Sequence, residues 1–205
     1  MTRQIVWKPY PSTSEETMKT NKPAYVSAAR IVLAAAFILL LPLLAMQFTN
    51  DVVWSLSDFA VAGGLLVGAG LAYELAARNA GNTAQRAAVG VAVLAVLLLV
   101  WVSLAVGIIG AEGDPADLMY LGVIGVGIVG AIVTRVQPQG MARVLFAMAL
   151  AQALVGVIAL IAGKQHSADS SATQIVGVNT MFIALFLGSA WLFRYSAREQ
   201  LPVRR

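Results

Sequence analysis

The stretch 87–110, AAVGVAVLAVLLLVWVSLAVGIIG, holds no charged residue and decides the fold class of this chain. About 20 apolar residues in a helix cross the ~30 Å hydrocarbon core of a bilayer, so this stretch is long enough to span it. Five similar stretches are 28–48, 59–77, 118–134, 144–163 and 175–193. With 59% hydrophobic and 12% charged residues, the chain is predicted to be an all-α, polytopic membrane protein, a bundle of six transmembrane helices.

The basic residues gather on one side of the membrane when these six stretches are threaded through it. Of the 14 Lys and Arg residues, Lys164 alone falls on the opposite side, which leaves 13 on the first. Short loops rich in Lys and Arg stay in the cytoplasm when a membrane protein inserts. The charge asymmetry therefore predicts that the N- and C-termini are both cytoplasmic.

The chain is expected to have one membrane domain between two tails. Residues 1–26 are polar and predicted to be a disordered cytoplasmic tail, 27–195 form the six-helix transmembrane domain, and 196–205 form a basic cytoplasmic tail. A cleavable signal peptide is the alternative for the first tail and span. A retained anchor is favoured, because the apolar run exceeds the usual ~7–15 residues and no A-x-A site follows it.

The loops between the spans are short, and their residues suit helix ends. The segment 55–58, SLSD, offers a capping box to the second helix, and 114–117, DPAD, places acids and a proline at the start of the fourth. Asn79 and Gly81 are expected to end the second helix in a left-handed conformation. This chemistry is structural.

The second and third helices resemble the fourth and fifth. Asp58 lies ten residues before Gly68, and Asp117 lies ten before Gly127. Both hairpins run in the same direction, so a duplication would be a parallel repeat about an axis along the membrane normal. The alternative is that any two hairpins with this topology look alike.

Glycines in the predicted helices indicate close packing, because small residues let helix backbones approach closely. The predicted helix-packing interface consists of Gly64, Gly68, Gly122, Gly125, Gly127 and Gly130. Those of the fourth span do not lie on one stripe, so that helix is expected to be packed on two sides. Packing inside one bundle, an interface with another protomer or partner, and a flexible gate all remain open.

Few polar side chains lie deep in the spans. Glu74 is one helical turn from Arg78, so we expect an i to i+4 ion pair. Glu74, Gln152 and Asn179 are the candidates for an ion or solute pathway. The alternative for the two amides is a hydrogen bond between helices.

Chemistry of other kinds is not indicated. The chain has no cysteine and one histidine, His166, so thiolate and paired-histidine metal sites are excluded within it. No phosphate-binding loop or hydrolase motif is present. We therefore expect no catalytic residue, no metal site, no cofactor and no enzymatic activity. Nucleic acid is not an expected partner, because the basic residues are explained by membrane topology.

Two segments, 100–120 (VWVSLAVGIIGAEGDPADLMY) and 135–163 (RVQPQGMARVLFAMALAQALVGVIALIAG), carry a resemblance. They are similar to a group of uncharacterised small bacterial inner-membrane proteins, and the likeness extends from the second helix onward. The resemblance implies a multi-helix bundle in a bacterial cytoplasmic (inner) membrane. It brings no activity, ligand or functional residue.

Three functions from different classes are consistent with the sequence. The first is a structural or accessory subunit that packs with itself, as a homo-oligomer, or with a larger membrane complex in the lipid bilayer. The second is a small transporter or channel, and the third is a lipid-binding or signalling module that uses the basic turns. A transporter predicts a water-accessible cavity at Gln152. An accessory protein predicts that this residue is buried and that an apolar, glycine-lined groove lies outside.

Overall fold

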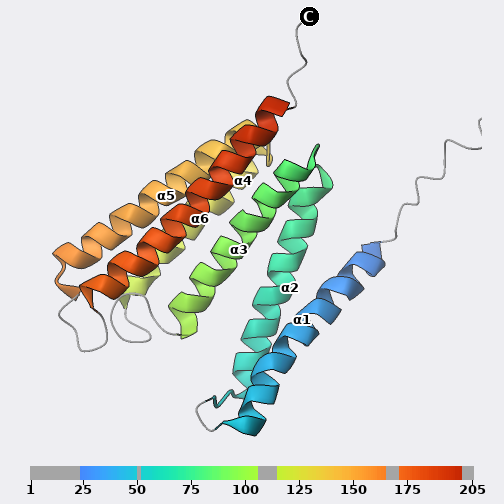
Figure 1. The fold of residues 1–205 in the computed structure, drawn as a ribbon, viewed down its shortest axis with the longest axis vertical. Helices are drawn as coiled ribbons and strands as arrows, with labels where there is room; N and C mark the ends of the chain where they lie inside the picture. The colour runs from blue at the N-terminus through green and yellow to red at the C-terminus, as the bar shows by residue number, and fades with distance from the viewer. Residues whose placement is uncertain (1–23, 50–51, 106–114, 165–170, 200–205) are drawn as a thin grey trace, which may run out of the picture.

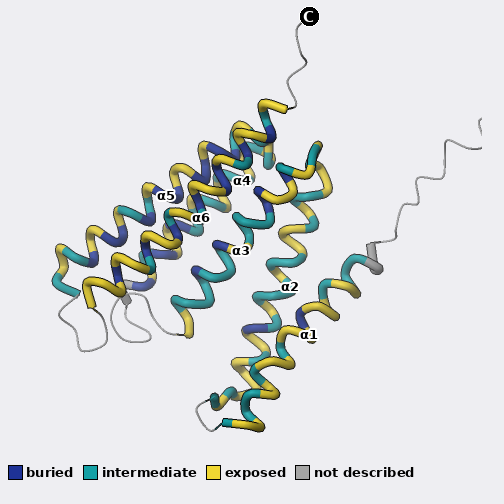
Figure 2. Tube along the Cα trace, in the orientation of Figure 1, coloured by how far each residue is buried: buried dark blue, intermediate teal, exposed yellow. Residues whose placement is uncertain are grey.

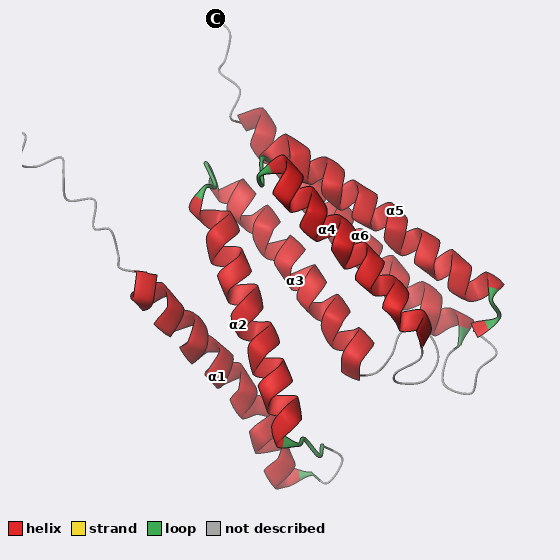
Figure 3. Ribbon diagram, turned by 180° about the vertical axis from the view of Figure 1, so that it is seen from behind, coloured by secondary structure: helices red, strands yellow, loops and turns green. Residues whose placement is uncertain are grey.

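A computed structural model describes residues 24–49, 52–105, 115–164 and 171–199 (Figure 1). Its elements are α1 (Ala24–Phe48), α2 (Leu56–Arg78), α3 (Thr83–Ala105), the 3₁₀ turn η1 (Pro115–Leu118), α4 (Met119–Thr134), α5 (Pro138–Ile161) and α6 (Ala172–Glu199). The described residues contain no strand (Figure 3). The predicted all-helical membrane bundle is confirmed.

Five of the helices are long and apolar enough to cross a bilayer, and α4 is shorter. Its 16 residues rise only ~24 Å at about 1.5 Å per residue. The four residues of η1 precede α4 directly and add ~8 Å at about 2 Å per residue. Together the two elements reach ~32 Å, close to the thickness of the hydrocarbon core.

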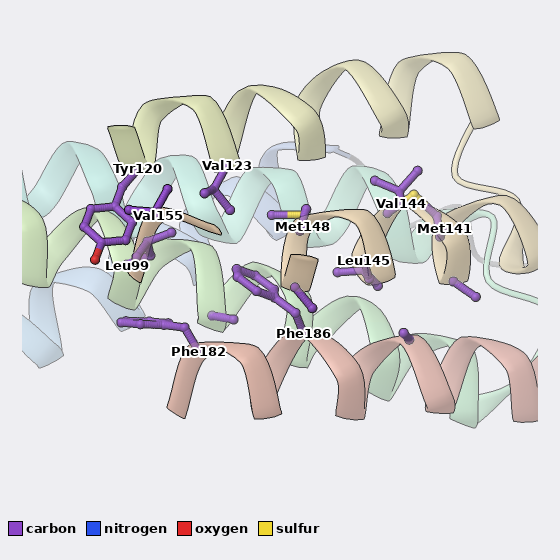
Figure 4. Close-up of a cluster of buried hydrophobic side chains, with 14 of the residues drawn as sticks. Leu99, Tyr120, Val123, Met141, Val144, Leu145, Met148, Val155, Phe182 and Phe186 are labelled. Carbon is purple, nitrogen blue, oxygen red and sulfur yellow. The ribbon is translucent and has the colours of Figure 1, made fainter. Parts of the chain in front are cut away.

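The compact part of the molecule is a bundle of α3, α4, α5 and α6, in which α5 packs on α6, α6 on α3 and α4 on α5. Large buried side chains fill it, among them Phe182, Phe186, Leu145 and Met148 (Figure 4). We use "basic end" for the end of the bundle where α2 ends and α5 begins, which carries Arg78, Arg135 and Arg143.

Buried positions in α5 and α6 recur at alternating steps of three and four residues. In α5 they include Met141, Leu145, Met148, Gln152, Val155 and Ala159, and in α6 Ile175, Asn179, Phe182, Phe186, Ser189, Phe193 and Ser196. This spacing averages 3.5 residues, the repeat that places one stripe of each helix in a shared seam. The α5 and α6 pair is therefore the centre of the bundle.

The first two helices form an arm beside this bundle. In α1 the described side chains are mostly exposed, and Ala35 is its one buried residue among them (Figure 2). α1 packs on α2, and α2 packs on α3. Small residues make the first contact possible, since a Cβ at Gly70 would lie 2.5 Å from Cγ2 of Ile31. We call α1 and α2 the arm.

Helix ends follow the local chemistry in part. The capping box of α2 is confirmed, because the Asp58 N–H donates to Ser55 Oγ at 3.3 Å and the Ser55 N–H donates to Asp58 Oδ2 at 2.7 Å. Asp114 lies outside the described residues. α1 starts at Ala24 and α6 continues to Glu199, so most of the two predicted tails also lies outside them.

The left-handed end expected for α2 is wrong. Asn79 has φ −96°, because side chains close this turn: the Gln85 N–H donates to Asn82 Oδ1 at 2.9 Å and the Gly81 N–H donates to Gln85 Oε1 at 3.0 Å. The left-handed residues instead follow α4, at Arg135 with φ 49° and the next position with φ 58°. The two hairpins suggested as a repeat are therefore closed in different ways.

Candidate functional site

Three polar side chains from three helices meet inside the bundle. Tyr120 comes from the start of α4, Gln152 from the middle of α5 and Asn179 from the first half of α6, and all three are buried. We call them the polar cluster. Figure 4 shows Tyr120 beside the apolar side chains that fill the bundle. The cluster is thus a polar layer within an otherwise apolar core.

Asn179 is the centre of the polar cluster. Its Nδ2 donates to the Ile175 carbonyl at 2.8 Å and to the Tyr120 hydroxyl at 3.1 Å. Its Oδ1 accepts from Gln152 Nε2 at 3.1 Å. Gly156 leaves room for this amide, because a Cβ there would lie 3.1 Å from Asn179 Cγ. One residue therefore joins three helices.

The cluster occupies seam positions of α5 and α6, so its geometry depends on the register of the two helices. A one-residue slip would move Gln152 and Asn179 apart and leave their amides without partners in a low-dielectric core. A buried amide in such a seam specifies register in coiled coils. Gln152 Oε1 has no hydrogen-bond partner among the described residues, so the arrangement also leaves one acceptor unused.

The structure does not bring the three predicted pathway residues together. Glu74 lies on α2 near the basic end and is half-buried, with Oε1 3.3 Å from a terminal nitrogen of Arg78. Gln152 and Asn179 lie in the bundle, and their predicted alternative, a hydrogen bond between helices, is the arrangement found. A continuous line of polar groups from Glu74 to the cluster is not formed by the described residues.

The sequence did not single out Tyr120 as a member of the site. The signal that identifies it is the repeat of α4. Tyr120, Val123, Gly127, Gly130 and Thr134 recur at steps of three and four residues, and the first two are buried. The same repeat separates the glycines of α4 into two groups.

Two of the six predicted packing glycines lie at a close contact between α4 and α5. A Cβ at Gly127 would lie 2.8 Å from Met148 Sδ, and one at Gly130 would lie 2.5 Å from Val144 Cγ2. These residues belong to the α4 seam. Here α4 approaches α5 closely because no side chain stands between the backbones.

The remaining four glycines do not pack inside the chain. A Cβ at Gly64, Gly68, Gly122 or Gly125 would meet no atom within 4 Å outside its own stretch of helix. For these four, the structure shows no close packing within the bundle. α4 packs mainly on α5 and touches α3 less, so its packing on two sides stays a prediction. Gly64, Gly68 and Gly122 are exposed, and Gly125 is half-buried.

A second polar network ties the basic end together. Asn82 Nδ2 donates to Glu199 Oε2 at 2.8 Å, and Ser196 Oγ donates to Asn82 Oδ1 at 2.9 Å. Deeper between α3 and α6, Ser189 Oγ donates to the Ala88 carbonyl at 2.7 Å. These bonds join the end of α6 to the start of α3, so their role is structural.

An apolar groove of about 310 Å³ lies between the arm and α3, toward the end opposite the basic end. The rings of Trp54 and Trp101 lie 5.4 Å apart there. The groove is lined by Ile38, Leu39, Leu41, Pro42, Trp54, Ala62, Leu65, Leu66, Leu97, Leu98 and Trp101. It is apolar, as expected of an outer groove, but its lining contains no glycine.

Among the described residues, no three His, Cys, Asp or Glu side chains are grouped so that they could hold a metal ion. The fold and its contacts define a helical membrane protein whose interior is a packed core that contains the polar cluster. Comparison with known proteins gave no match to a family model, a curated protein or a solved structure. The resemblance to small bacterial inner-membrane proteins stays a prediction.

Proposed function

We propose that this protein is a non-enzymatic structural or accessory subunit, which packs with a second copy of itself or within a larger membrane complex through one face of α2. The observation that carries the proposal is a stripe of small exposed residues along that helix. Ala60, Gly64, Gly68 and Ala72 are four residues apart and all exposed. We call this stripe the open face.

The open face is the part of α2 that the chain leaves unused. Gly63 and Gly70 face α1, since a Cβ at either would meet Leu39 or Ile31. Ala62 is the one residue of α2 that is buried among those described, and it lines the groove next to α3. The open face points away from both neighbours at 100° per residue.

Small residues at four-residue spacing suit helix association in a bilayer. Lipid tails are as apolar as leucine side chains, so association there depends on close van der Waals contact between backbones. Glycine and alanine permit that contact. A stripe of this kind gives no advantage against disordered lipid chains, which supports a protein helix as its occupant.

The proposed orientation places the basic end in the cytoplasm. Helix ends and the turn at that end carry Arg78, Arg86, Arg135 and Arg143, whereas Lys164 lies at the other end. The positive-inside rule then puts both termini in the cytoplasm. The bacterial inner membrane is proposed from the sequence resemblance.

Transport is less well supported. Gln152 and Asn179 are the deepest candidates for a pathway, yet Gln152 has an exposed fraction of 0%. Its Nε2 donates a hydrogen bond to Asn179. Gln152 lines neither the apolar groove nor the pocket between the start of α5 and the end of α6. The polar cluster is better explained by the register of α5 and α6.

The test compares association in liposomes. Full-length protein labelled with donor or acceptor dye should show energy transfer that rises with the protein to lipid ratio. Gly64→Leu combined with Gly68→Leu should abolish it, because two bulky side chains keep the backbones apart. The control is Gly122→Leu with Gly125→Leu on α4, where Cβ atoms also meet open space.

If energy transfer is lost in the α4 double variant but kept in the α2 double variant, the interface lies elsewhere and the open face is rejected. Absence of transfer in the wild type would reject self-association. In that case proteins that co-purify after mild detergent extraction are compared between wild type and the α2 pair. A partner that both retain equally would reject the open face as the site of complex formation.

A further inference from the structure

A pocket of about 280 Å³ lies at the basic end, between the start of α5 and the end of α6. Its lining includes three arginines, Arg143 from α5 and Arg194 and Arg198 from α6, together with Gln139. We propose that this basic pocket binds the phosphate headgroup of an anionic phospholipid in the leaflet at that end. The inference does not depend on the proposed function.

In the part of the chain that the structure describes, no carboxylate forms an ion pair with the arginines of the pocket. Among the described residues, the acids at the basic end are Glu74, which pairs with Arg78, and Glu199, whose carboxylate accepts a hydrogen bond from Asn82. No described carboxylate oxygen forms an ion pair with a pocket arginine. An anion from outside is therefore the group that would neutralise the pocket.

The backbone adds to this positive field. Arg194 and Arg198 are one turn apart on α6, so their like charges repel each other without a ligand. The N-terminus of α5 opens beside the pocket, and its N-cap residue, Gln137, makes no side-chain hydrogen bond to the first turn. That end of a helix carries a partial positive charge that favours anions.

Arginine suits a phosphate in particular. Its planar guanidinium donates two parallel hydrogen bonds to phosphate oxygens, and it is more weakly hydrated than lysine. A volume of about 280 Å³ is slightly below that of pockets that hold drug-sized molecules, which are typically ~300–1,000 Å³. It is therefore sized for a headgroup. Basic pockets between transmembrane helices are a known type of site for lipid headgroups.

The position of the pocket indicates a lipid in preference to a soluble phosphate. Trp191 and Tyr195 are exposed on α6 next to Arg194, and their rings stack at 5.9 Å. Exposed tryptophan and tyrosine mark the headgroup level of a membrane. Trp191, Arg194 and Arg198 lie three and four residues apart, so the aromatic ring and the arginines occupy one face.

The experiment titrates the full-length protein in zwitterionic micelles with phosphatidylglycerol, and separately with phosphatidylcholine of the same acyl chains, at about 0.15 M salt. The apparent Kd is read from the shift of the melting temperature. Phosphatidylglycerol should raise the melting temperature and phosphatidylcholine should not. Arg143→Gln with Arg194→Gln should weaken phosphatidylglycerol binding roughly 30-fold, corresponding to about 1 kcal/mol for each arginine near a membrane surface.

The matched control removes the same charge from the same end. Arg86 and Arg135 are exposed and do not line the pocket. Arg86→Gln with Arg135→Gln should therefore change the affinity by less than about threefold, since exposed charges that do not contact the ligand are weakened by salt screening. Equal losses in the two pairs would show diffuse surface attraction and overturn the proposal.

Two further measurements distinguish a lipid from a soluble phosphate and cover the case in which the variant does not fold. Inorganic phosphate that raises the melting temperature as much as phosphatidylglycerol at the same concentration would assign the pocket to a soluble ligand and reject a lipid. If the double variant Arg143→Gln with Arg194→Gln does not fold, Arg143→Lys with Arg194→Lys is measured instead. That pair keeps the charge but loses the paired hydrogen bonds, and wild-type affinity in it would reject recognition by guanidinium groups.

Discussion

Gly130→Ala provides a sharp test of the α4 and α5 contact. The added Cβ would lie 2.5 Å from Cγ2 and 3.0 Å from Cβ of Val144, and it would also meet Cγ1 of that residue. Ordinary van der Waals contact starts at 3.4 Å, so the groups must separate by at least about 0.9 Å, the difference between 3.4 and 2.5 Å. Val144 cannot rotate away easily, because a β-branched side chain in a helix has one strongly preferred rotamer.

The magnitude follows from a comparison of two variants of one helix. Overpacking typically costs ~1–3 kcal/mol. Gly125→Ala is the control, because a Cβ at Gly125 meets no atom within 4 Å. Both variants gain the same helix propensity of about 1 kcal/mol, which cancels in the comparison. Gly130→Ala should therefore have a free energy of unfolding ~1–3 kcal/mol below that of Gly125→Ala.

The assay is equilibrium unfolding in mixed micelles, followed by circular dichroism. Val144→Ala removes the methyl groups that Gly130→Ala meets, so the double variant should recover the clash as a coupling energy of about 1 kcal/mol or more. Gly127→Ala should cost less than Gly130→Ala, because its neighbour, Met148, is unbranched and flexible. Equal stability of the alanine variants at Gly125 and Gly130 would refute the close approach of α4 and α5.

Asn179→Leu should lower the free energy of unfolding by ~1–3 kcal/mol, because it leaves buried polar groups without partners. Gln152→Met should lower it by only about 0.6 kcal/mol, because it removes one interhelical hydrogen bond. Equal losses in unfolding experiments would contradict the central place of Asn179. Glu74→Gln should change the melting temperature little and leave proton and cation flux into liposomes unchanged; wild-type flux that disappears in the variant would favour a transporter. A single cysteine placed at Gln139 should be protected from an impermeant thiol reagent in intact cells and one at Ser57 should be labelled, since the chain has no cysteine of its own; the opposite pattern would invert the proposed topology.

Helix positions were predictable to within about six residues. The stretch 59–77 became Leu56–Arg78, and 144–163 became Pro138–Ile161. The start of α5 lies six residues before the predicted stretch, because hydropathy counts Arg143 against a span while the helix itself begins at a favourable first-turn proline, Pro138. Its end, at Ile161, lies two residues inside that stretch. The capping box at Ser55 was also readable, because it depends on residues three apart in the chain.

The polar cluster was predictable in part. Gln152 and Asn179 were recognisable as buried amides from their depth in apolar stretches. Their contact with each other, and with Tyr120, depends on how α5 and α6 are aligned. The repeat of three and four residues in both helices was present in the sequence and predicts which positions face the seam, but it does not say which helix faces which.

The sequence by itself determined where the apolar helices lie and how many there are. The reason is that the free energy of transferring a residue into a bilayer depends mainly on that residue. Only the tertiary structure decided the use of each glycine. Gly68 and Gly127 have similar sequence surroundings, yet a Cβ at Gly127 meets Met148 and one at Gly68 meets open space. The reason is physical: packing depends on the side chain that the opposite helix presents, and that side chain lies far away in the sequence.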